Sequence, residues 1–253
     1  MINIKSSRDL QRMREACVIS ARALQIGGQA VQPGVTTGEI DRLIRQYIES
    51  MGAKPSFLGY GGYPASACIS VNETVIHGIP GNTVIREGDI VSIDVGAAIN
   101  GFNGDNAATF AAGRVSREAQ ALMDATRESL YEGIAAARAG NRVGDIGAAV
   151  QRYVEMRGYS VVRQFVGHGV GTDLHEDPSV PNFGTPGRGQ KLLPGMTLAI
   201  EPMVNAGTHE VSILGDGWTT VTKDGRLSAH FEHTVAITPE GPIIMTDPEG
   251  KLR

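Results

Sequence analysis

Five side chains that can act as metal ligands occur in apolar or glycine-rich surroundings, in the order Asp94, Asp105, His168, Glu201 and Glu232. Carboxylates can bridge two divalent cations and cancel most of their charge, and one imidazole adds a directional ligand. A carboxylate in an apolar run is costly to bury without a partner. Because several carboxylates occur in such runs, we expect them to converge on a shared pair of cations.

The spacing of the two aspartates predicts that they share one face of a β-hairpin. Asn100-Gly101 is a dipeptide typical of a two-residue hairpin turn. With this dipeptide at the centre of the turn, Asp94 lies opposite Ala107, and Asp105 is two residues from Ala107 on the same strand. Diagonal neighbours of this kind lie about 7–8 Å apart, which suits carboxylates that flank two metal ions roughly 3.5–4 Å apart. The alternative is that Asp105 caps the turn and Asp94 is a charge at a strand edge.

The remaining three residues also lie in segments that predict burial. Pro202 favours an extended backbone at Glu201, Glu232 lies in a strand-like run, and His168 lies between two glycines. Each has a simpler alternative, which is an arginine partner for a glutamate or a core hydrogen bond for the histidine. A set of oxygens with one nitrogen and no thiolate suits Mn, Fe, Co or Zn and excludes a structural zinc finger.

Composition limits the classes of protein that the chain can represent. Its 253 residues carry 23 basic and 27 acidic side chains, and a net charge of −4 gives no electrostatic indication of nucleic-acid binding. No apolar stretch is long enough to span a membrane, and the polar start predicts no secretory signal. Two cysteines are too few for a disulfide framework. We therefore expect a cytoplasmic protein.

Hydrophobic periodicity predicts four helices and several strands. The helices are expected over 8–31, with an end near 27–28 or at Pro33, over 36–51 before Gly52, from 116 toward Gly140, and over 143–157 before Gly158. The second helix begins with a capping-box pattern, Thr36 and Glu39. Short strands are expected at 67–71, 89–98 and 106–110, with strands and loops after 161. No linker divides the chain, so we expect one α+β domain over residues 1–253.

A faint internal repeat suggests a duplicated unit. Residues 88–94 and 195–201 both read as glycine, four residues, isoleucine and an acid, and His77-Gly78 is echoed by His168-Gly169. Two helices precede the main strands in each half. A duplicated helix–helix–sheet unit, joined across a common sheet, would bring both acidic strands near one centre. The alternative is that such short matches arise by chance.

The chain resembles the type I methionine aminopeptidases, within the creatinase/prolidase-like group that has the duplicated "pita-bread" fold. The motifs occur in the family order over roughly residues 5–240, which is nearly the whole chain. They are Asn72-Glu73 with His77-Gly78-Ile79-Pro80, Ser92-Ile93-Asp94-Val95-Gly96, Gly104-Asp105, Gly167-His168-Gly169-Val170-Gly171, His175-Glu176-Asp177-Pro178, Ile200-Glu201-Pro202-Met203 and Phe231-Glu232-His233-Thr234. The resemblance implies a central, curved, antiparallel sheet and two divalent metal ions.

The same resemblance assigns roles to particular residues. It implies that the five residues above are the ligands of the two ions, and that His77 and His175 contact the substrate without binding metal. A pocket for the methionine side chain would be lined by Tyr60, Tyr63, Cys68 and Trp218. Two positions depart from the family, because Phe57 stands where a cysteine is common and Leu174 where an aromatic residue is common. These departures affect the shape of the pocket rather than the reaction.

The implied reaction is metal-assisted hydrolysis of an N-terminal peptide bond. Two metal ions lower the pKa of a bridging water toward about 7 and so supply hydroxide. Glu201 would take the water proton and pass it to the leaving amine, His175 would donate a hydrogen bond to the oxyanion, and His77 would hold the amide. The implied substrates are nascent polypeptides that begin with methionine followed by a small residue. A transient association with the ribosome and a monomeric state are also expected.

Three other functions share parts of this pattern. An enzyme that cleaves Xaa-Pro bonds uses the same ligand set, but we expect a large N-terminal domain there and not the tyrosine-rich segment 59–64. An amidinohydrolase of this fold would also carry an additional N-terminal domain. A non-catalytic binding protein that kept the fold usually loses ligands. The short chain, with neither an N-terminal zinc-binding extension nor a long insertion between His168 and Glu201, favours a bacterial-style catalytic core.

Overall fold

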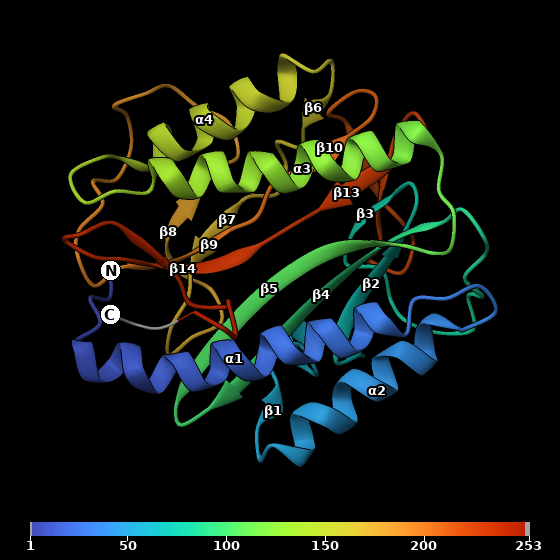
Figure 1. Ribbon diagram of the computed structural model, residues 1–253, viewed down its shortest axis with the longest axis horizontal. Helices are drawn as coiled ribbons and strands as arrows, with labels where there is room; N and C mark the ends of the chain where they lie inside the picture. Colours follow the sequence, from blue (N-terminus) through green and yellow to red (C-terminus); the bar gives the residue numbers. More distant parts are fainter. Residues whose placement is uncertain (1, 251–253) are drawn as a thin grey trace.

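Two pairs of helices cover antiparallel strands in the structure, a computed structural model that describes residues 2–250 (Figure 1). One pair is α1 (Ser7–Gln29) and α2 (Thr37–Ser50). The other pair is α3 (Arg117–Ala136) and α4 (Val143–Glu155), which lie on the opposite side of the strands in Figure 1. None of the helices within residues 2–250 is both long enough and apolar enough to cross a membrane.

The helix boundaries follow local capping chemistry. The predicted capping box is confirmed, since the Thr36 hydroxyl accepts from the backbone N–H of Glu39 and the Glu39 carboxylate accepts from that of Thr36. Helix α1 continues through its two glycines to Gln29 rather than stopping at them. At Gly28 a Cβ atom would lie 2.2 Å from the Phe110 ring, so glycine permits the helix to approach the sheet closely.

The predicted hairpin forms with the predicted register. Strands β4 (Ile90–Ile99) and β5 (Phe102–Ala111) pair antiparallel, and Asp94 lies opposite Ala107. Asn100 and Gly101 have φ values of 55° and 80°, as a type I′ turn requires. Because this turn is tight, β5 begins at Phe102 and not at residue 106 as expected. Two further strands flank β4, namely β1 (Lys54–Pro55) and β2 (Ala67–Val71).

The second half of the chain forms a five-stranded antiparallel sheet in the order β15-β14-β9-β7-β8. Its strands are β7 (Gly167–Gly169), β8 (Glu176–Val180), β9 (Thr197–Ile200), β14 (His233–Ile237) and β15 (Pro242–Ile244). Two smaller sheets are β13-β10-β6 and β11-β12-β3. Their strands are β3 (Thr74–Ile76), β6 (Ser160–Val161), β10 (Met203–Asn205), β11 (Val211–Ile213), β12 (Thr220–Thr222) and β13 (Ser228–His230).

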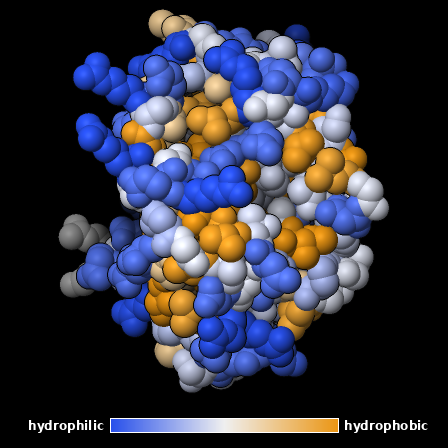
Figure 2. Space-filling model, turned by 90° about the vertical axis from the view of Figure 1, so that its right-hand side faces the viewer, coloured by the Kyte–Doolittle hydropathy of each residue, from blue (hydrophilic) through white to orange (hydrophobic). Residues whose placement is uncertain are grey.

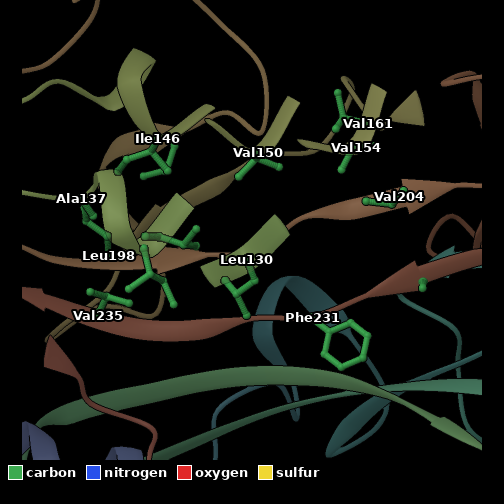
Figure 3. Close-up of a cluster of buried hydrophobic side chains, with 14 of the residues drawn as sticks. Leu130, Ala137, Ile146, Val150, Val154, Val161, Leu198, Val204, Phe231 and Val235 are labelled. Carbon is green, nitrogen blue, oxygen red and sulfur yellow. The ribbon is translucent and has the colours of Figure 1, made fainter. Parts of the chain in front are cut away.

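The two halves are built alike, in agreement with the sequence repeat. Strand β4 lies between β2 and β5, and strand β9 lies between β7 and β14. The repeated glycines, Gly88 and Gly195, have φ values of 91° and 90°. Each half also has its own buried core under its own helix pair. In Figure 3, Leu130, Ile146 and Val150 of α3 and α4 lie near side chains of β9 and β14.

Strand β5 joins the halves. The backbone N–H of Glu232 donates to the Ala107 carbonyl at 2.8 Å. The Thr234 hydroxyl donates to the Asp105 carbonyl at 2.7 Å and accepts from the Asp105 N–H at 3.1 Å. These hydrogen bonds hold Asp105, on β5, beside Glu232, which comes from the second half of the chain.

Candidate metal centre and adjoining pocket

The five predicted ligands and the two additional histidines all line one cavity of about 200 Å³. Asp94 comes from β4 and Asp105 from β5, while His168 comes from β7. Glu201 directly follows β9, and Glu232 directly precedes β14. The cavity therefore lies where the two halves meet, as the duplicated pattern of acids predicts.

The potential ligand atoms lie close enough to share cations. One ligand atom each from Asp105, His168 and Glu232 lies within 4.8 Å of the other two. His168 Nε2 is 3.8 Å from Asp105 Oδ2 and 3.5 Å from Glu201 Oε1. Ligands bound to one ion at about 2.0–2.2 Å lie within roughly 4.4 Å of each other. The spacing of the cluster matches such a site.

Buried oxygen atoms without partners provide an independent test of this fit. Among residues 2–250, Asp94 Oδ1, Asp105 Oδ1 and Glu232 Oε1 are buried and have no hydrogen-bond partner. Such atoms carry the full cost of desolvation unless a cation or donor compensates for it. Divalent cations would satisfy all three oxygens at once, so the residues present fit a metal centre.

The electrostatics of the cluster agree with this interpretation. Burial raises the pKa of Asp94 to about 7 and that of Glu201 to about 8. Burial, and then the charge of Asp94 or Asp105, raises the pKa of Asp105 and Glu232 well above the usual range. Without a counter-ion these carboxyl groups retain protons, whereas bound cations would favour their ionised forms.

His168 is oriented as a metal ligand would be. Its Nδ1 lies 2.8 Å from the Gly169 carbonyl, which can only accept, so Nδ1–H is the donor. Nε2 then presents its lone pair to the carboxylates. Burial lowers the pKa of His168 to about 3, so the ring is neutral and able to bind a cation. A ligating histidine typically donates its other N–H in this way.

The two additional histidines line the same cavity and have separate neighbours. His175 packs 4.2 Å from His168 between ring centroids, and its Nδ1 lies 2.7 Å from the Tyr60 hydroxyl. His77 contacts Phe165 and Trp218 edge-on, at centroid distances of 5.5 and 6.1 Å. Burial lowers the pKa of both histidines, to about 4 for His77. Both are neutral near pH 7 and can donate a hydrogen bond through one ring nitrogen.

An apolar pocket adjoins the carboxylates. All four predicted pocket residues line the cavity, as do the two residues that depart from the family, Phe57 and Leu174. The Tyr63 ring meets Trp218 edge-on at 5.2 Å, and its hydroxyl donates to the Gly78 carbonyl at 2.9 Å. Cys68 lies opposite Asp94 in the β2–β4 pairing, which places the apolar wall directly beside the acids. Tyr60, in contrast, is 45% exposed at the rim.

Sequence reasoning missed several residues near this centre, among them Phe165 and His230. Phe165 lines the cavity against His77 from an irregular segment that gives no periodic signal. His230 is 1% exposed, and its Nε2 lies 3.7 Å from Glu201 Oε2. A signal for His230 was present, because it precedes Glu232 by two residues in a strand-like run.

Comparison with known proteins shows the family of this chain. The family model of metallopeptidase family M24 matches residues 11–239. The chain belongs to metallopeptidase family M24. Methionine aminopeptidase of Clostridium perfringens is 54% identical over 246 residues, with 97% of this chain and 99% of that protein covered. Methionine aminopeptidase 1 of Bacillus subtilis is 50% identical with the same coverage.

Solved structures agree with this M24 assignment. The crystal structure of methionine aminopeptidase from Thermotoga maritima matches with a TM-score of 0.96 and 46% identity, covering 97% of this chain and 99% of that one. Prolidase from Pyrococcus furiosus matches with a TM-score of 0.79 at 22% identity, covering 66% of that chain, and so shares the fold. The M24 chain thus has the predicted pita-bread fold. Its family and its acidic cluster together indicate use of divalent metal.

Proposed function

We propose that this M24 chain is a methionine aminopeptidase that removes an N-terminal methionine when the second residue is small. One observation carries the proposal, namely a cluster of carboxylates suited to metal that opens directly onto an apolar pocket. The names of the relatives that are 50–54% identical over nearly the full length support the same substrate. We treat residues 1–253 as one catalytic domain, which is supported by a cavity lined from both halves.

In this proposal Asp94, Asp105, His168, Glu201 and Glu232 hold two divalent ions, which are Co, Mn, Fe or Zn. Bound ions would lower the pKa of water and polarise the scissile carbonyl. Glu201 accepts the water proton and returns it to the leaving amine. The position of Glu201 in the cavity lining, with its Oε1 3.5 Å from His168 Nε2, supports a role beside the metal centre.

The two histidines bind the peptide bond in this proposal. His175 donates a hydrogen bond to the carbonyl oxygen as that oxygen gains negative charge. His77 holds the adjoining amide, and the edges of Phe165 and Trp218 fix its ring. The neutral state of both rings, which follows from burial, leaves each with a single N–H to donate.

The methionine side chain would occupy the apolar pocket between Tyr63, Cys68 and Trp218, with Tyr60 at its rim. Phe57 and Leu174 pack in the same apolar cluster and complete its wall. Nascent polypeptides are the proposed substrates, which puts the reaction in the cytoplasm beside the ribosome, with transient ribosome contact. A monomer remains our prediction. Figure 2 supports it for one face, where hydrophobic side chains form separate groups among hydrophilic ones.

The test uses two tripeptides with metal-stripped protein. The protein is treated with EDTA, and Mn²⁺, Co²⁺, Fe²⁺ or Zn²⁺ is then added back to separate samples. Release of methionine from Met-Ala-Ser, with no cleavage of Ala-Pro-Ala, is the expected result. Cleavage of the proline peptide alone would instead favour the Xaa-Pro activity. Failure to cleave either peptide with any metal would favour a binding protein.

A further inference from the structure

His230 is held rigidly beside the proposed metal centre. It ends β13, where it pairs with Met203 of β10 and is 1% exposed. Its backbone N–H donates to the Thr109 hydroxyl, and that hydroxyl donates to the His230 carbonyl, both at 2.9 Å. The Ser92 hydroxyl lies 2.8 Å from the same Thr109 oxygen. The Thr109 side chain of β5 therefore makes two hydrogen bonds to the backbone of His230 and fixes its position.

The His230 imidazole lies next to the proposed metal centre, and Glu201 stands between them. His230 Nε2 lies 3.7 Å from Glu201 Oε2, while Glu201 Oε1 lies 3.5 Å from His168 Nε2. His230 Nε2 is buried and has no hydrogen-bond partner among residues 2–250. His230 is also absent from the described residues that line the cavity. One Glu201 oxygen thus faces the predicted ligand His168, and the other faces His230.

The contact between His230 and Glu201 favours the imidazole tautomer that carries its proton on Nε2. A Glu201 side chain that holds a cation is ionised. If Nε2 were unprotonated, its lone pair would point at the lone pairs of an ionised carboxylate. With the proton on Nε2, the same contact becomes a charge-assisted hydrogen bond. The 3.7 Å separation is longer than a hydrogen bond, and catalytic hydrogen bonds often shorten when an enzyme binds its substrate.

We propose that His230 is a positioning residue for Glu201, with its Nε2–H donating to Glu201 Oε2 and directing Oε1 toward the metals. The inference rests on the dinuclear centre proposed above. His230 itself touches neither substrate nor metal. Partners that orient a ligand in this way typically change metal affinity by about 10- to 100-fold.

The test measures cobalt binding rather than activity. Metal-free wild type and three variants, His230→Leu, His230→Gln and His230→Asn, are titrated with Co²⁺ and followed by calorimetry and visible absorption. The terminal amide of glutamine can place an N–H near the position of Nε2, whereas the shorter asparagine places it near Nδ1. His209→Leu removes an exposed histidine outside the cavity and serves as the control.

We expect His230→Leu to melt within a few degrees of metal-free wild type and to bind Co²⁺ about 10- to 100-fold more weakly. His230→Gln should bind within about threefold of wild type and restore its Co²⁺ spectrum, while His230→Asn should behave like His230→Leu. If His230→Leu fails to fold, the test is the difference in Co²⁺ affinity between His230→Gln and His230→Asn.

Three results would overturn the inference. Unchanged Co²⁺ affinity in both His230→Leu and His230→Asn would show that no orienting bond exists. Equal weakening in His230→Gln would mean that the imidazole itself is required, as a direct ligand would be. Failure of the wild type to bind Co²⁺ would overturn the proposed metal centre itself and is thereby distinguished from the other two results.

Discussion

The Tyr60 hydroxyl lies 2.7 Å from His175 Nδ1 and connects two loops that are 115 positions apart in the chain. Tyr60 begins the short 3₁₀ turn η1 (Tyr60–Gly62), and Gly59 and Gly61 on either side have positive φ values of 83° and 55°. A tyrosine O–H that donates to Nδ1 keeps the histidine proton on Nε2. Tyr60 thereby leaves His175 with a donor for the substrate.

Tyr60→Phe keeps the ring and removes only this hydroxyl. One uncharged hydrogen bond contributes about 0.5–1.5 kcal/mol, so we expect kcat to fall by up to about 10-fold while KM changes little. Steady-state kinetics with Met-Ala-Ser measure both quantities. Tyr47→Phe on α2, outside the cavity, is the matched control. A rise in KM with unchanged kcat would mean that Tyr60 acts only in binding the side chain.

His175→Ala should separate substrate activation from metal binding. If His175 donates to the developing oxyanion, kcat falls by about 100- to 1,000-fold while two metals still bind. Metal content by plasma mass spectrometry, measured on the same samples as kcat, tests this. Loss of metal from the variant would show that His175 is a ligand, contrary to the role proposed here.

Asp105→Asn should impair metal loading without unfolding the protein. The backbone of Asp105 is held by Thr234, and its Oδ1 has no hydrogen-bond partner among residues 2–250. The nearly isosteric amide therefore keeps the fold but would weaken one of the predicted metal ligands. We expect activity to fall by about 100-fold or more with the melting temperature of the metal-free protein maintained. Full activity in this variant would contradict the dinuclear centre.

The metal-free protein should lose stability as pH rises. In the folded state burial raises the pKa of Asp94 from 3.8 to about 7 and that of Glu201 from 4.5 to about 8. These groups stay protonated when folded while the unfolded chain has already released their protons, so raising the pH favours unfolding until both folded groups ionise. Histidines of the unfolded chain titrate near pH 6.5 and are mostly neutral above about pH 7.5. The interval from about pH 7.5 to about pH 9 therefore isolates the carboxyl groups, and Glu201→Gln leaves every histidine in place.

Urea unfolding in EDTA at both ends of that interval measures this effect. Stability should fall across the interval for wild type and fall less for Glu201→Gln, which cannot ionise. With saturating metal the trend should reverse, because cations bind the ionised carboxylates and compete with protons. Equal slopes for the two proteins in EDTA would contradict the raised pKa of Glu201.

The sequence predicted those features that depend on neighbours along the chain. The Asn100-Gly101 turn sets the register of β4 and β5, and that register alone puts Asp94 and Asp105 on one face. The capping box at Thr36 likewise sets the start of α2. The repeated glycine, isoleucine and acid pattern predicted that β4 and β9 hold equivalent positions.

Features that depend on packing between distant segments could not be predicted in this way. The Tyr60–His175 bond requires two loops to meet across the cavity mouth, and no local pattern encodes that contact. Likewise, the closeness of His230 to Glu201 depends on how β13 pairs with β10. In helix α1, the Phe110 ring fills the space beside Gly28 and the Ile44 side chain fills the space beside Gly27, and both contacts come from other parts of the chain.

The central claim is that two metal ions in this cavity release methionine, and one measurement tests it most directly. Metal ions bound per chain are counted by plasma mass spectrometry during stepwise addition of Mn²⁺ or Co²⁺ to stripped protein, with methionine release from Met-Ala-Ser measured at each step. The account predicts that release is absent without metal and that binding saturates at about two ions per chain. Methionine release by the stripped protein in EDTA, or no metal bound at saturation, would contradict it.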